Sequence, residues 1–271
     1  MKTVLITGAA GGVGLALAKS FASQGHALVL TDRNAAALAA TAAKVGSKTE
    51  QIIADLRDAS DLQRLGARIE SPEAPIDILV NNAGIIVPGP VGTLDADLMR
   101  AHIDVNMTAP MLLSAAAARA MKQRRSGYIF SIMSMAAMGP MKDSAAYSAS
   151  KFGLRGFMAS LSLELHPYGV GVGGVFPSAI DTPMLAAEMA SPDGSPLNFV
   201  GNAKPMPPHD VAAAVMKAME KGRLETCLPA SDGFFGGVLM LFPSLLRPVL
   251  SYLEKGGQKK KQAYLQGLQT K

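Results

Sequence analysis

Short apolar runs alternate with longer amphipathic stretches along most of the chain. The apolar runs lack the polar–apolar alternation of a strand with one face in water, so they predict strands buried on both faces of a parallel sheet. These runs are residues 3–7, 27–31, 51–54, 76–80, 127–132, 170–176 and 226–229. The stretches between them predict helices over residues 13–24, 35–45, 61–70, 98–123, 147–165 and 209–221. The fourth helix is expected to break near Asn106.

The regular alternation of strands and helices predicts an α/β fold. We expect a doubly wound parallel sheet of about seven strands, with right-handed crossovers and helices on both faces. Of the 271 residues, 1–232 are expected to form a single domain that includes a substrate loop within 183–208. Residues 233–271 are expected to form an extension that is first apolar and then basic.

The chain has a formal charge of +5 and a pI of about 9.3, which raises the question of nucleic-acid or membrane binding. Residues 241–271 hold six bases and one acid, whereas the other 240 residues hold 20 bases and 20 acids. The excess charge therefore belongs to the tail, and we expect no nucleic-acid partner. Hydrophobic residues make up 49% of the chain, which excludes a disordered protein.

Two features favour a cytoplasmic protein. Cys227 is the single cysteine, so no disulfide framework can form, which suits a reducing compartment. The N-terminal segment turns glycine-rich too early to provide the apolar stretch of a signal peptide. The apolar segment 234–253 contains Pro243, Arg247 and Pro248 and is too broken to span a membrane.

A glycine-rich turn follows the first predicted strand and opens the first helix. It reads Thr7-Gly-Ala-Ala-Gly-Gly-Val-Gly14. In this context glycines let the backbone approach a pyrophosphate, while the helix N-terminus supplies N–H donors and a positive dipole end. The turn therefore predicts dinucleotide phosphate binding at Gly8, Gly12, Val13 and Gly14, with an ordinary turn as the alternative.

Acidic residues end the next two predicted strands. Asp32 lies 24 residues after Gly8, where a carboxylate can bond both ribose hydroxyls of NAD and repel the 2′-phosphate of NADP. We therefore expect NAD as the preferred cofactor, although Arg33 leaves NADP open. Asp55 and Leu56 follow the third strand and are expected beside the adenine. A turn role is the alternative for both acids.

Two further motifs complete a set. Asn81-Asn-Ala-Gly84 follows the fourth strand, and Tyr147-Ser-Ala-Ser-Lys151 opens the helix after the fifth. With the glycine-rich turn, in this order and spacing, the chain resembles the short-chain dehydrogenase/reductase family over residues 1 to about 230. The resemblance implies a Rossmann fold and hydride transfer between a nicotinamide cofactor and an alcohol or ketone.

Tyr147 and Lys151 suit general acid–base catalysis. They are four residues apart, so they share one helix face. A tyrosine with its ordinary pKa of about 10 is a poor base at neutral pH, but a nearby ammonium and an oxidised nicotinamide favour the phenolate and lower that pKa. Tyr147 is then expected to take a proton from an alcohol or return one to a carbonyl. The resemblance gives Lys151 a second role at the nicotinamide ribose.

The resemblance implies two more catalytic residues. Ser134 lies 13 residues before Tyr147, where the family places a serine that holds the substrate oxygen, and Ser131 is the alternative. Asn106 matches the family's helix-kink asparagine, where a freed backbone carbonyl binds a water linked to the lysine. The alternative for Asn106 is a plain polar residue within a helix.

The resemblance also extends the predicted cofactor site to the later strand ends. These contacts are Asn82, Ala83, Gly84, Pro177, Ile180 and Thr182. Of these, the Ile180 N–H and Thr182 are expected near the nicotinamide carboxamide. Ser178 replaces the glycine usual in the family, so the shape of this loop stays open.

Other chemistries find little support in the sequence. Ser134 lies in no G-x-S-x-G elbow, so a hydrolase triad is not expected. The four histidines are scattered without ligand spacing, so no metal site is predicted. A non-catalytic NAD(P)-binding sensor and a membrane-surface interaction protein stay open as alternatives, although a pure binder need not keep the whole catalytic set.

Sixteen methionines, several near the expected substrate site, favour a lipophilic substrate. The predicted substrate contacts are Ser134, Met135, Tyr147 and Met184. Core filling is the alternative for the methionines. The resemblance implies a homodimer or homotetramer paired through helices 98–123 and 147–165.

The tail departs from the family pattern after Asp232. In a helix, its apolar residues from Leu245 to Leu253 would share one face, although Pro248 would strain a helix that does not begin there. The apolar face and the lysines at 259–261 indicate peripheral contact with an anionic membrane. The alternative is that the tail covers the substrate pocket or packs on a partner subunit, with solvated lysines.

Overall fold

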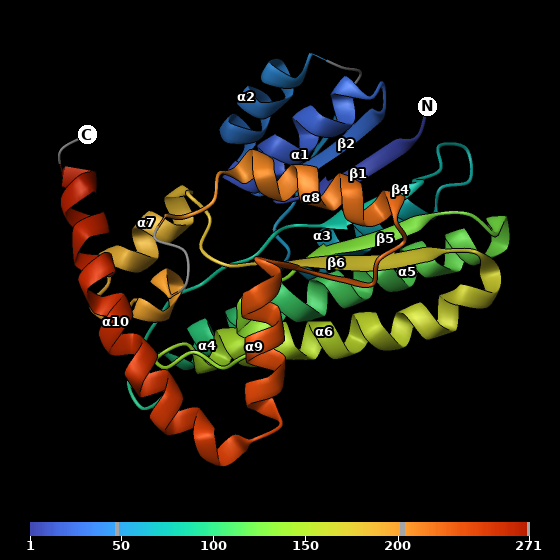
Figure 1. Ribbon diagram of the computed structural model, residues 1–271. Helices are drawn as coiled ribbons and strands as arrows, with labels where there is room; N and C mark the ends of the chain where they lie inside the picture. Colours follow the sequence, from blue (N-terminus) through green and yellow to red (C-terminus); the bar gives the residue numbers. More distant parts are fainter. Residues whose placement is uncertain (47–48, 201–203, 270–271) are drawn as a thin grey trace.

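The computed structural model describes residues 1–46, 49–200 and 204–269, and these residues contain a sheet of seven parallel strands. The strand order is β3-β2-β1-β4-β5-β6-β7 (Figure 1). The strands are β1 (Thr3–Thr7), β2 (Ala27–Asp32), β3 (Thr49–Ile53), β4 (Ile78–Asn81), β5 (Tyr128–Ile132), β6 (Gly171–Pro177) and β7 (Glu225–Leu228). The predicted doubly wound α/β fold is confirmed.

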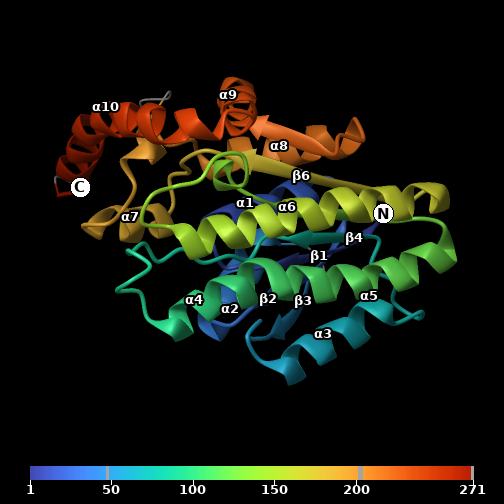
Figure 2. The same ribbon diagram turned by 90° about the horizontal axis from the view of Figure 1, so that it is seen from below.

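Helices cover both faces of this sheet (Figure 2). One layer holds α1 (Gly12–Ser23), α2 (Ala35–Val45) and α8 (Pro208–Glu220). The other holds α3 (Ala59–Glu70), α4 (Ala96–Ile103), α5 (Ala109–Arg124) and α6 (Ala145–Leu165). Successive residues of β1 serve opposite layers, since Val4 and Ile6 pack with α1 and α8 while Leu5 packs with α5 and α6. A strand buried on both faces needs apolar residues at every position, which explains the unbroken apolar runs.

Side-chain caps move two helix starts from their predicted positions. α3 begins two residues early because the Asp58 carboxylate accepts hydrogen bonds from N–H groups of the first turn. Asp95 caps α4 in the same way, and this helix also begins two residues early. The predicted break near Asn106 is present as a π-helical turn, Asp104–Thr108, between α4 and α5.

The tail folds into two helices that meet at a corner (Figure 1). They are α9 (Ala230–Met240) and α10 (Pro243–Gln269). The second helix runs beside α7 (Pro183–Ala190) and the turn Pro196–Phe199, at the carboxyl ends of the strands. Residues 201–203 of the predicted substrate loop, and the end of the tail with Lys271, lie outside the described residues. In the described part of the chain, no helix is long and apolar enough to cross a membrane.

Pro248 lies inside α10, which starts at Pro243, so the strain expected for a helix that does not begin at this proline applies here. Pro248 lies in the second turn of the helix. A proline there lacks the N–H whose partner would have been the carbonyl of Ser244, and its ring crowds that carbonyl. Ser244 is exposed, so water can take the place of the missing donor.

The lysines at 259–261 are not all solvated, which corrects one of the two expectations for the tail. Lys261 is 6% exposed, and its Nζ donates to the carbonyls of Ser191 at 3.2 Å, Pro192 at 3.4 Å and Gly194 at 2.6 Å. One turn earlier, Gly257 approaches the turn Pro196–Phe199 so closely that a Cβ would lie 2.2 Å from the Pro196 carbonyl oxygen. α10 is therefore anchored on the loop after α7.

This anchor predicts that Lys261→Met destabilises the protein by about 1–3 kcal/mol, because three backbone carbonyls, of which that of Gly194 is buried, lose a charged donor. The measurement is the free energy of unfolding from chemical denaturation. Lys259→Met is the matched control, since Lys259 is exposed on the same helix. Equal stability of the two variants would contradict the anchoring role.

Candidate active site

A cleft of about 680 Å³ opens at the carboxyl ends of the strands, and most of the predicted cofactor residues line it. β1 and β4 are neighbours in the sheet but not in sequence, so the chain turns away in opposite directions on either side of this point. The predicted residues in the lining are Gly8, Gly12, Val13, Gly14, Asp32, Arg33, Asp55, Leu56, Asn82, Ala83, Gly84, Tyr147, Lys151, Ile180, Thr182 and Met184. Pro177, Ser134 and Met135 are not among the lining residues.

The glycine-rich turn has no room for a side chain at Gly8 or at Gly14. Gly8 has φ +63°, and a Cβ on it would lie 2.7 Å from the Cα of Ala83. A Cβ on Gly14 would lie 2.2 Å from the Gly8 carbonyl oxygen. The N-cap of α1, Gly11, provides no side-chain cap, so the first N–H groups of the helix have no side-chain acceptor there. A bare backbone cradle at a helix N-terminus fits the pyrophosphate of a dinucleotide.

The Asn82-Ala83 segment ties the end of β4 to this turn. The Thr7 hydroxyl oxygen accepts hydrogen bonds from the N–H groups of Asn82 and Ala83, each at 3.0 Å. The Asn82 side-chain amide donates to the carbonyls of Thr7 at 2.9 Å and Gly8 at 3.0 Å. Through these contacts Asn82 holds the glycine-rich turn at a fixed distance from the end of β4.

Asp32 ends β2 with its carboxylate held against the glycine-rich turn. One carboxylate oxygen accepts from the Ala10 N–H at 3.1 Å, and the other accepts from the Asn34 N–H at 3.1 Å. Arg33, the next residue, is exposed at the rim of the cleft. A carboxylate therefore lies where the predicted ribose site is, with a guanidinium beside it.

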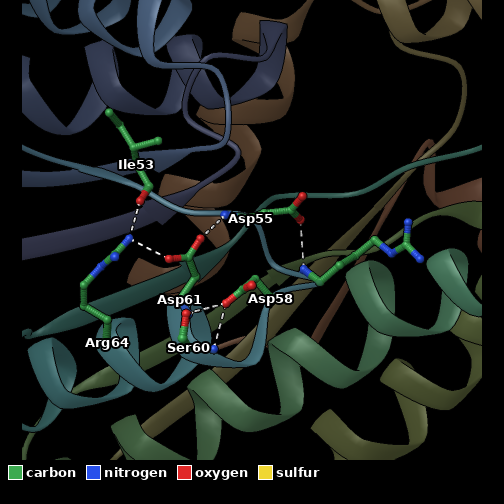
Figure 3. Close-up of polar contacts among 7 residues, drawn as sticks. Ile53, Asp55, Asp58, Ser60, Asp61 and Arg64 are labelled. Carbon is green, nitrogen blue, oxygen red and sulfur yellow. Dashed lines mark hydrogen bonds and ion pairs between the residues drawn. The ribbon is translucent and has the colours of Figure 1, made fainter.

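Asp55 lies in a turn after β3 that a network of polar contacts holds in shape (Figure 3). The Asp61 carboxylate accepts from the Asp55 N–H at 2.8 Å and pairs with Arg64 at 2.8 Å. Arg64 in turn donates to the Ile53 carbonyl. The Asp55 carboxylate accepts from the Arg57 N–H at 2.9 Å. The turn role considered for Asp55 is therefore present, and the residue also lines the cleft.

Tyr147 and Lys151 line the cleft, and Ser134 lies close to Tyr147 behind that lining. The Ser134 side chain is near enough to the Tyr147 hydroxyl to favour its phenolate, and the Lys151 Nζ lies 5.8 Å from the centre of the Tyr147 ring. Lys151 is 4% exposed and donates to the Ile132 carbonyl at 3.3 Å. Ser131, the alternative to Ser134, points into the core, where its hydroxyl contacts Met158 and receives the Asn81 amide.

Burial has a large effect on the pKa of both Tyr147 and Lys151. Desolvation at this enclosed position raises the pKa of Tyr147 to about 12; the Ser134 hydrogen bond lowers it and the charge of Glu188 raises it further. Burial also lowers the pKa of Lys151 to about 8. Desolvation is the largest cause for both residues, because burial penalises the charged form of each group.

Asn106 is fully buried in the π-helical turn and is bound to two other segments. Its side-chain oxygen accepts from the Ile85 N–H at 2.8 Å, and its amide donates to the Ile85 carbonyl at 2.9 Å and the Ser150 hydroxyl at 3.1 Å. A Cβ on Gly84 would lie 3.3 Å from this asparagine oxygen and 3.6 Å from the Lys151 Nζ. Asn106 and Lys151 therefore both lie close to Gly84, and the water link that the resemblance implies for Asn106 stays a prediction.

His102 packs against Tyr147, a contact that no local sequence signal predicts. The two rings meet edge to face with centres 6.4 Å apart. One imidazole nitrogen accepts from the Val87 N–H at 3.0 Å, and the other lies 2.7 Å from the Leu98 carbonyl. Burial lowers the pKa of His102, so its neutral ring forms a fixed wall behind Tyr147.

The loop after β6 closes the other side of the cleft. Thr182 caps α7 through a hydrogen bond from the Leu185 N–H at 3.3 Å, and its methyl group would lie 3.0 Å from a Cβ on Gly12. Pro177 ends β6 outside the cleft, and the Ser178 N–H continues the sheet by donating to the Leu228 carbonyl at 2.8 Å. The serine that replaces the family glycine is thus accommodated within the strand pairing.

The predicted substrate methionines occupy different places. Met184 is 47% exposed at the mouth of the cleft, and Met133 lines its interior. Met135 packs instead toward Gly233 of α9, where a Cβ would lie 3.8 Å from its terminal methyl group. Met189 is buried in a small core with Phe199, so core filling applies to this methionine.

A buried carboxylate stands in the wall that α7 and α10 form beside the cleft. Glu188 is 6% exposed and accepts from the Asn198 side-chain amide at 2.7 Å. Burial raises the pKa of Glu188 to about 7, while Asn198, the Lys261 ammonium and the Ser195 N–H act in the opposite direction. Neither Glu188 nor Lys261 was predicted as a site residue, because no local sequence signal links them.

Comparison with families of known proteins gives one match over most of this region. A family model described as short chain dehydrogenase matches residues 2–193. 2,3-dihydro-2,3-dihydroxybenzoate dehydrogenase of Bacillus subtilis is 34% identical over 228 residues, which are 79% of this chain and 87% of that protein.

Solved structures agree with this match. A short-chain dehydrogenase from Sphingobium yanoikuyae in complex with NADPH has a TM-score of 0.77 and 30% identity, covering 90% of this chain and 96% of that one. The bulky-bulky ketone specific alcohol dehydrogenase from Comamonas testosteroni has a TM-score of 0.73 and 28% identity, covering 84% of this chain and 86% of that one.

Glu188 predicts a pH dependence of stability. Its pKa is about 7 in the folded chain against an ordinary 4.5, so between these values the folded chain keeps a proton that the unfolded chain has lost. Stability is therefore lost as pH rises through this window, by up to roughly 1.4 kcal/mol per pH unit. Glu188→Gln removes the titration, so its stability relative to the parent should increase from pH 4.5 to pH 7.

The measurement is the free energy of unfolding of both proteins across this pH range. Glu164→Gln, on the exposed side of α6, makes the same chemical change without burial and serves as the control. If the Glu188→Gln and Glu164→Gln curves run parallel to the parent, the carboxyl does not titrate in this window.

Proposed function

The chain belongs to the short-chain dehydrogenase family of NAD(P)-dependent oxidoreductases, and from this we propose that it interconverts lipophilic secondary alcohols and ketones with NAD. The observation that carries the proposal is the group formed by Tyr147 and Lys151, which line the dinucleotide cleft, and the neighbouring Ser134. An oxidoreductase acting on alcohols or ketones needs an acid–base group there and a donor for the substrate oxygen.

In this proposal each catalytic side chain has one task. Tyr147 holds the proton that passes to or from the substrate oxygen, and Ser134 orients that oxygen through its hydroxyl. Lys151 supplies a positive charge near Tyr147, and its pKa of about 8 keeps the ammonium the major form at neutral pH. Asn106 positions the segment of α4 and α5 that lies behind the lysine. A bound nicotinamide supplies the carbon that accepts or donates hydride and, when oxidised, a further positive charge.

The raised pKa of Tyr147 favours its role as an acid. With a pKa of about 12 in the chain alone, the hydroxyl is protonated at neutral pH and ready to donate to a ketone oxygen. The reverse direction needs the phenolate, and positive charge brought next to an enclosed hydroxyl lowers its pKa strongly because the surroundings have a low dielectric constant.

Apolar side chains at the cleft support a lipophilic substrate. Met133 and Met184 line it, and Ile85 and Val105 add to its apolar surface. Methionine adapts to irregular apolar shapes, which suits a bulky ligand. The Comamonas relative is specific for bulky-bulky ketones, which is in keeping with this proposal.

The NAD preference in this proposal depends on Asp32. Its carboxylate is fixed by two backbone N–H groups, so it cannot easily swing away from a 2′-phosphate. The Sphingobium relative was solved with NADPH, and Arg33 offers a guanidinium at the same rim. We expect the repulsion between the fixed Asp32 carboxylate and a 2′-phosphate to outweigh the attraction of the exposed Arg33 for that phosphate.

We also propose a homodimer or homotetramer paired through α5 and α6. Leu112 on α5 is 52% exposed and Leu163 on α6 is 77% exposed. Large apolar side chains on two long helices at the surface favour a partner copy that covers them.

Tyr147→Phe should lower kcat/KM for a hydrophobic secondary alcohol by about 10²–10⁴-fold, because it removes the hydroxyl that transfers the proton. NADH binding, followed by fluorescence titration, should stay nearly unchanged. Tyr128→Phe is the control, since it removes another buried hydroxyl at the far end of β5. Activity that survives Tyr147→Phe would contradict the mechanism.

Asp32→Asn should raise the affinity for NADPH relative to NADH by about tenfold or more, because a neutral amide no longer repels the 2′-phosphate. Titration of both reduced cofactors against the parent and the variant measures this ratio. Tighter binding of NADPH than of NADH by the parent protein would overturn the preference, and Arg33→Ala would then reveal whether the arginine causes it.

A further inference from the structure

The corner between α9 and α10 carries exposed large apolar side chains, which we call the apolar corner. They are Phe234, Phe235, Val238, Met240, Leu241, Phe242 and Leu245. Phe234 is 77% exposed and Leu241 is 74% exposed. In Figure 1 the two helices meet at a tip that points away from the sheet. So many neighbouring apolar side chains in water mark an interaction surface.

The orientation of α9 is the reverse of an ordinary surface helix. Its glycines face the protein, since a Cβ on Gly233 would lie 2.2 Å from the Cys227 sulfur and a Cβ on Gly236 would lie 3.2 Å from the Cβ of Met138. The phenylalanines at 234 and 235 are therefore left outside. A helix of a globular protein normally buries its apolar stripe, so this one presents its apolar side to something other than its own core.

The charges around the apolar corner are mostly positive. Residues 233–253 contain no acid, and Arg247 is their single charged residue; Asp232 and Glu254 flank this range. Further along α10, Lys255, Lys259 and Lys260 follow, and the described residues supply no ion-pair partner for these three lysines or for Arg247. The surface is thus apolar at its tip and basic along the helix that leads from it.

We propose that the apolar corner docks the protein on an anionic lipid bilayer. Its apolar side chains would enter the boundary between headgroups and acyl chains, and the bases of α10 would contact lipid phosphates. A second copy of the chain is the less suitable occupant. Pairing two copies through the same patch would bring together two helices on which the exposed bases outnumber the single acid, Glu254.

The test is cosedimentation of the full chain with vesicles of phosphatidylcholine, with and without phosphatidylglycerol. We expect binding to the vesicles that contain phosphatidylglycerol, and a strong decrease both in neutral vesicles and at high salt. Phe242→Asp and Leu241→Asp should each weaken this binding by about tenfold or more, because they place a negative charge at the tip. Lys259→Glu and Lys260→Glu should weaken it without changing the apolar tip.

Val91→Asp is the matched control, because Val91 is 59% exposed in a loop of the other half of the chain. It should leave vesicle binding unchanged. Failure of the full chain to sediment with anionic vesicles, or an equal loss in the control, would overturn the proposal. Sedimentation velocity of the same variants adds a further outcome: if Phe242→Asp splits an oligomer and vesicle binding is absent, a second copy covers the corner.

Discussion

The contact between the turn after β1 and the end of β4 is the constraint on which the rest of the site depends. At Gly8 the backbone is left-handed, and no side chain fits between it and Ala83. The Thr7 hydroxyl and the Asn82 amide then lock the two segments together. This contact lies where the strand order reverses, so it joins the half of the sheet that carries Asp32 to the half that carries Tyr147. A displacement here would separate the two ends of the cleft.

Burial sets the chemistry at the inner end of that cleft. Burial raises the pKa of Tyr147 and lowers the pKa of Lys151, so it disfavours the charged form of each side chain. The same low dielectric strengthens every charge that is brought into the site. The enclosed pair therefore responds to bound ligands more strongly than an exposed tyrosine and lysine would. His102 and Asn106, both buried and hydrogen bonded, keep the surrounding walls in place.

Much of the fold and the cofactor side of the site could be predicted from the sequence, because the signals there are local. Strands buried on both faces are apolar throughout, and the glycines at 8 and 14 serve contacts that only glycine permits. Helix caps are local signals as well. Asp58 and Asp95 each lie directly before the helix that they cap, so both helix starts could be predicted from the sequence. The rise that burial causes in the Tyr147 pKa could not be predicted, because residue spacing shows which charges are near but not how much water is removed.

Long-range contacts were beyond a sequence reading. Lys261 and the carbonyl of Ser191 are 70 residues apart, and a lysine in a basic run has no feature that distinguishes it from solvated neighbours. The aromatic contact of His102 with Tyr147 likewise depends on how α4 crosses α6. In such cases the partner is chosen by packing, and a single sequence contains no period or motif that records it.

The tail helices α9 and α10 carry two kinds of surface, the apolar corner and the side of α10 that packs on the loop after α7. Gly257 and Lys261 lie one turn apart on α10, and their side of the helix fits the loop after α7 too closely to be a loose appendage. Because Lys261 is occupied by backbone carbonyls, the positive charge that α10 presents to solvent comes from Arg247, Lys255, Lys259 and Lys260. Arg247 and Lys255 lie between the apolar corner and the anchor, and Lys259 and Lys260 lie within the anchored turn. Rigid attachment at one end therefore holds the corner at a fixed position relative to the cleft, which a flexible basic tail would not do.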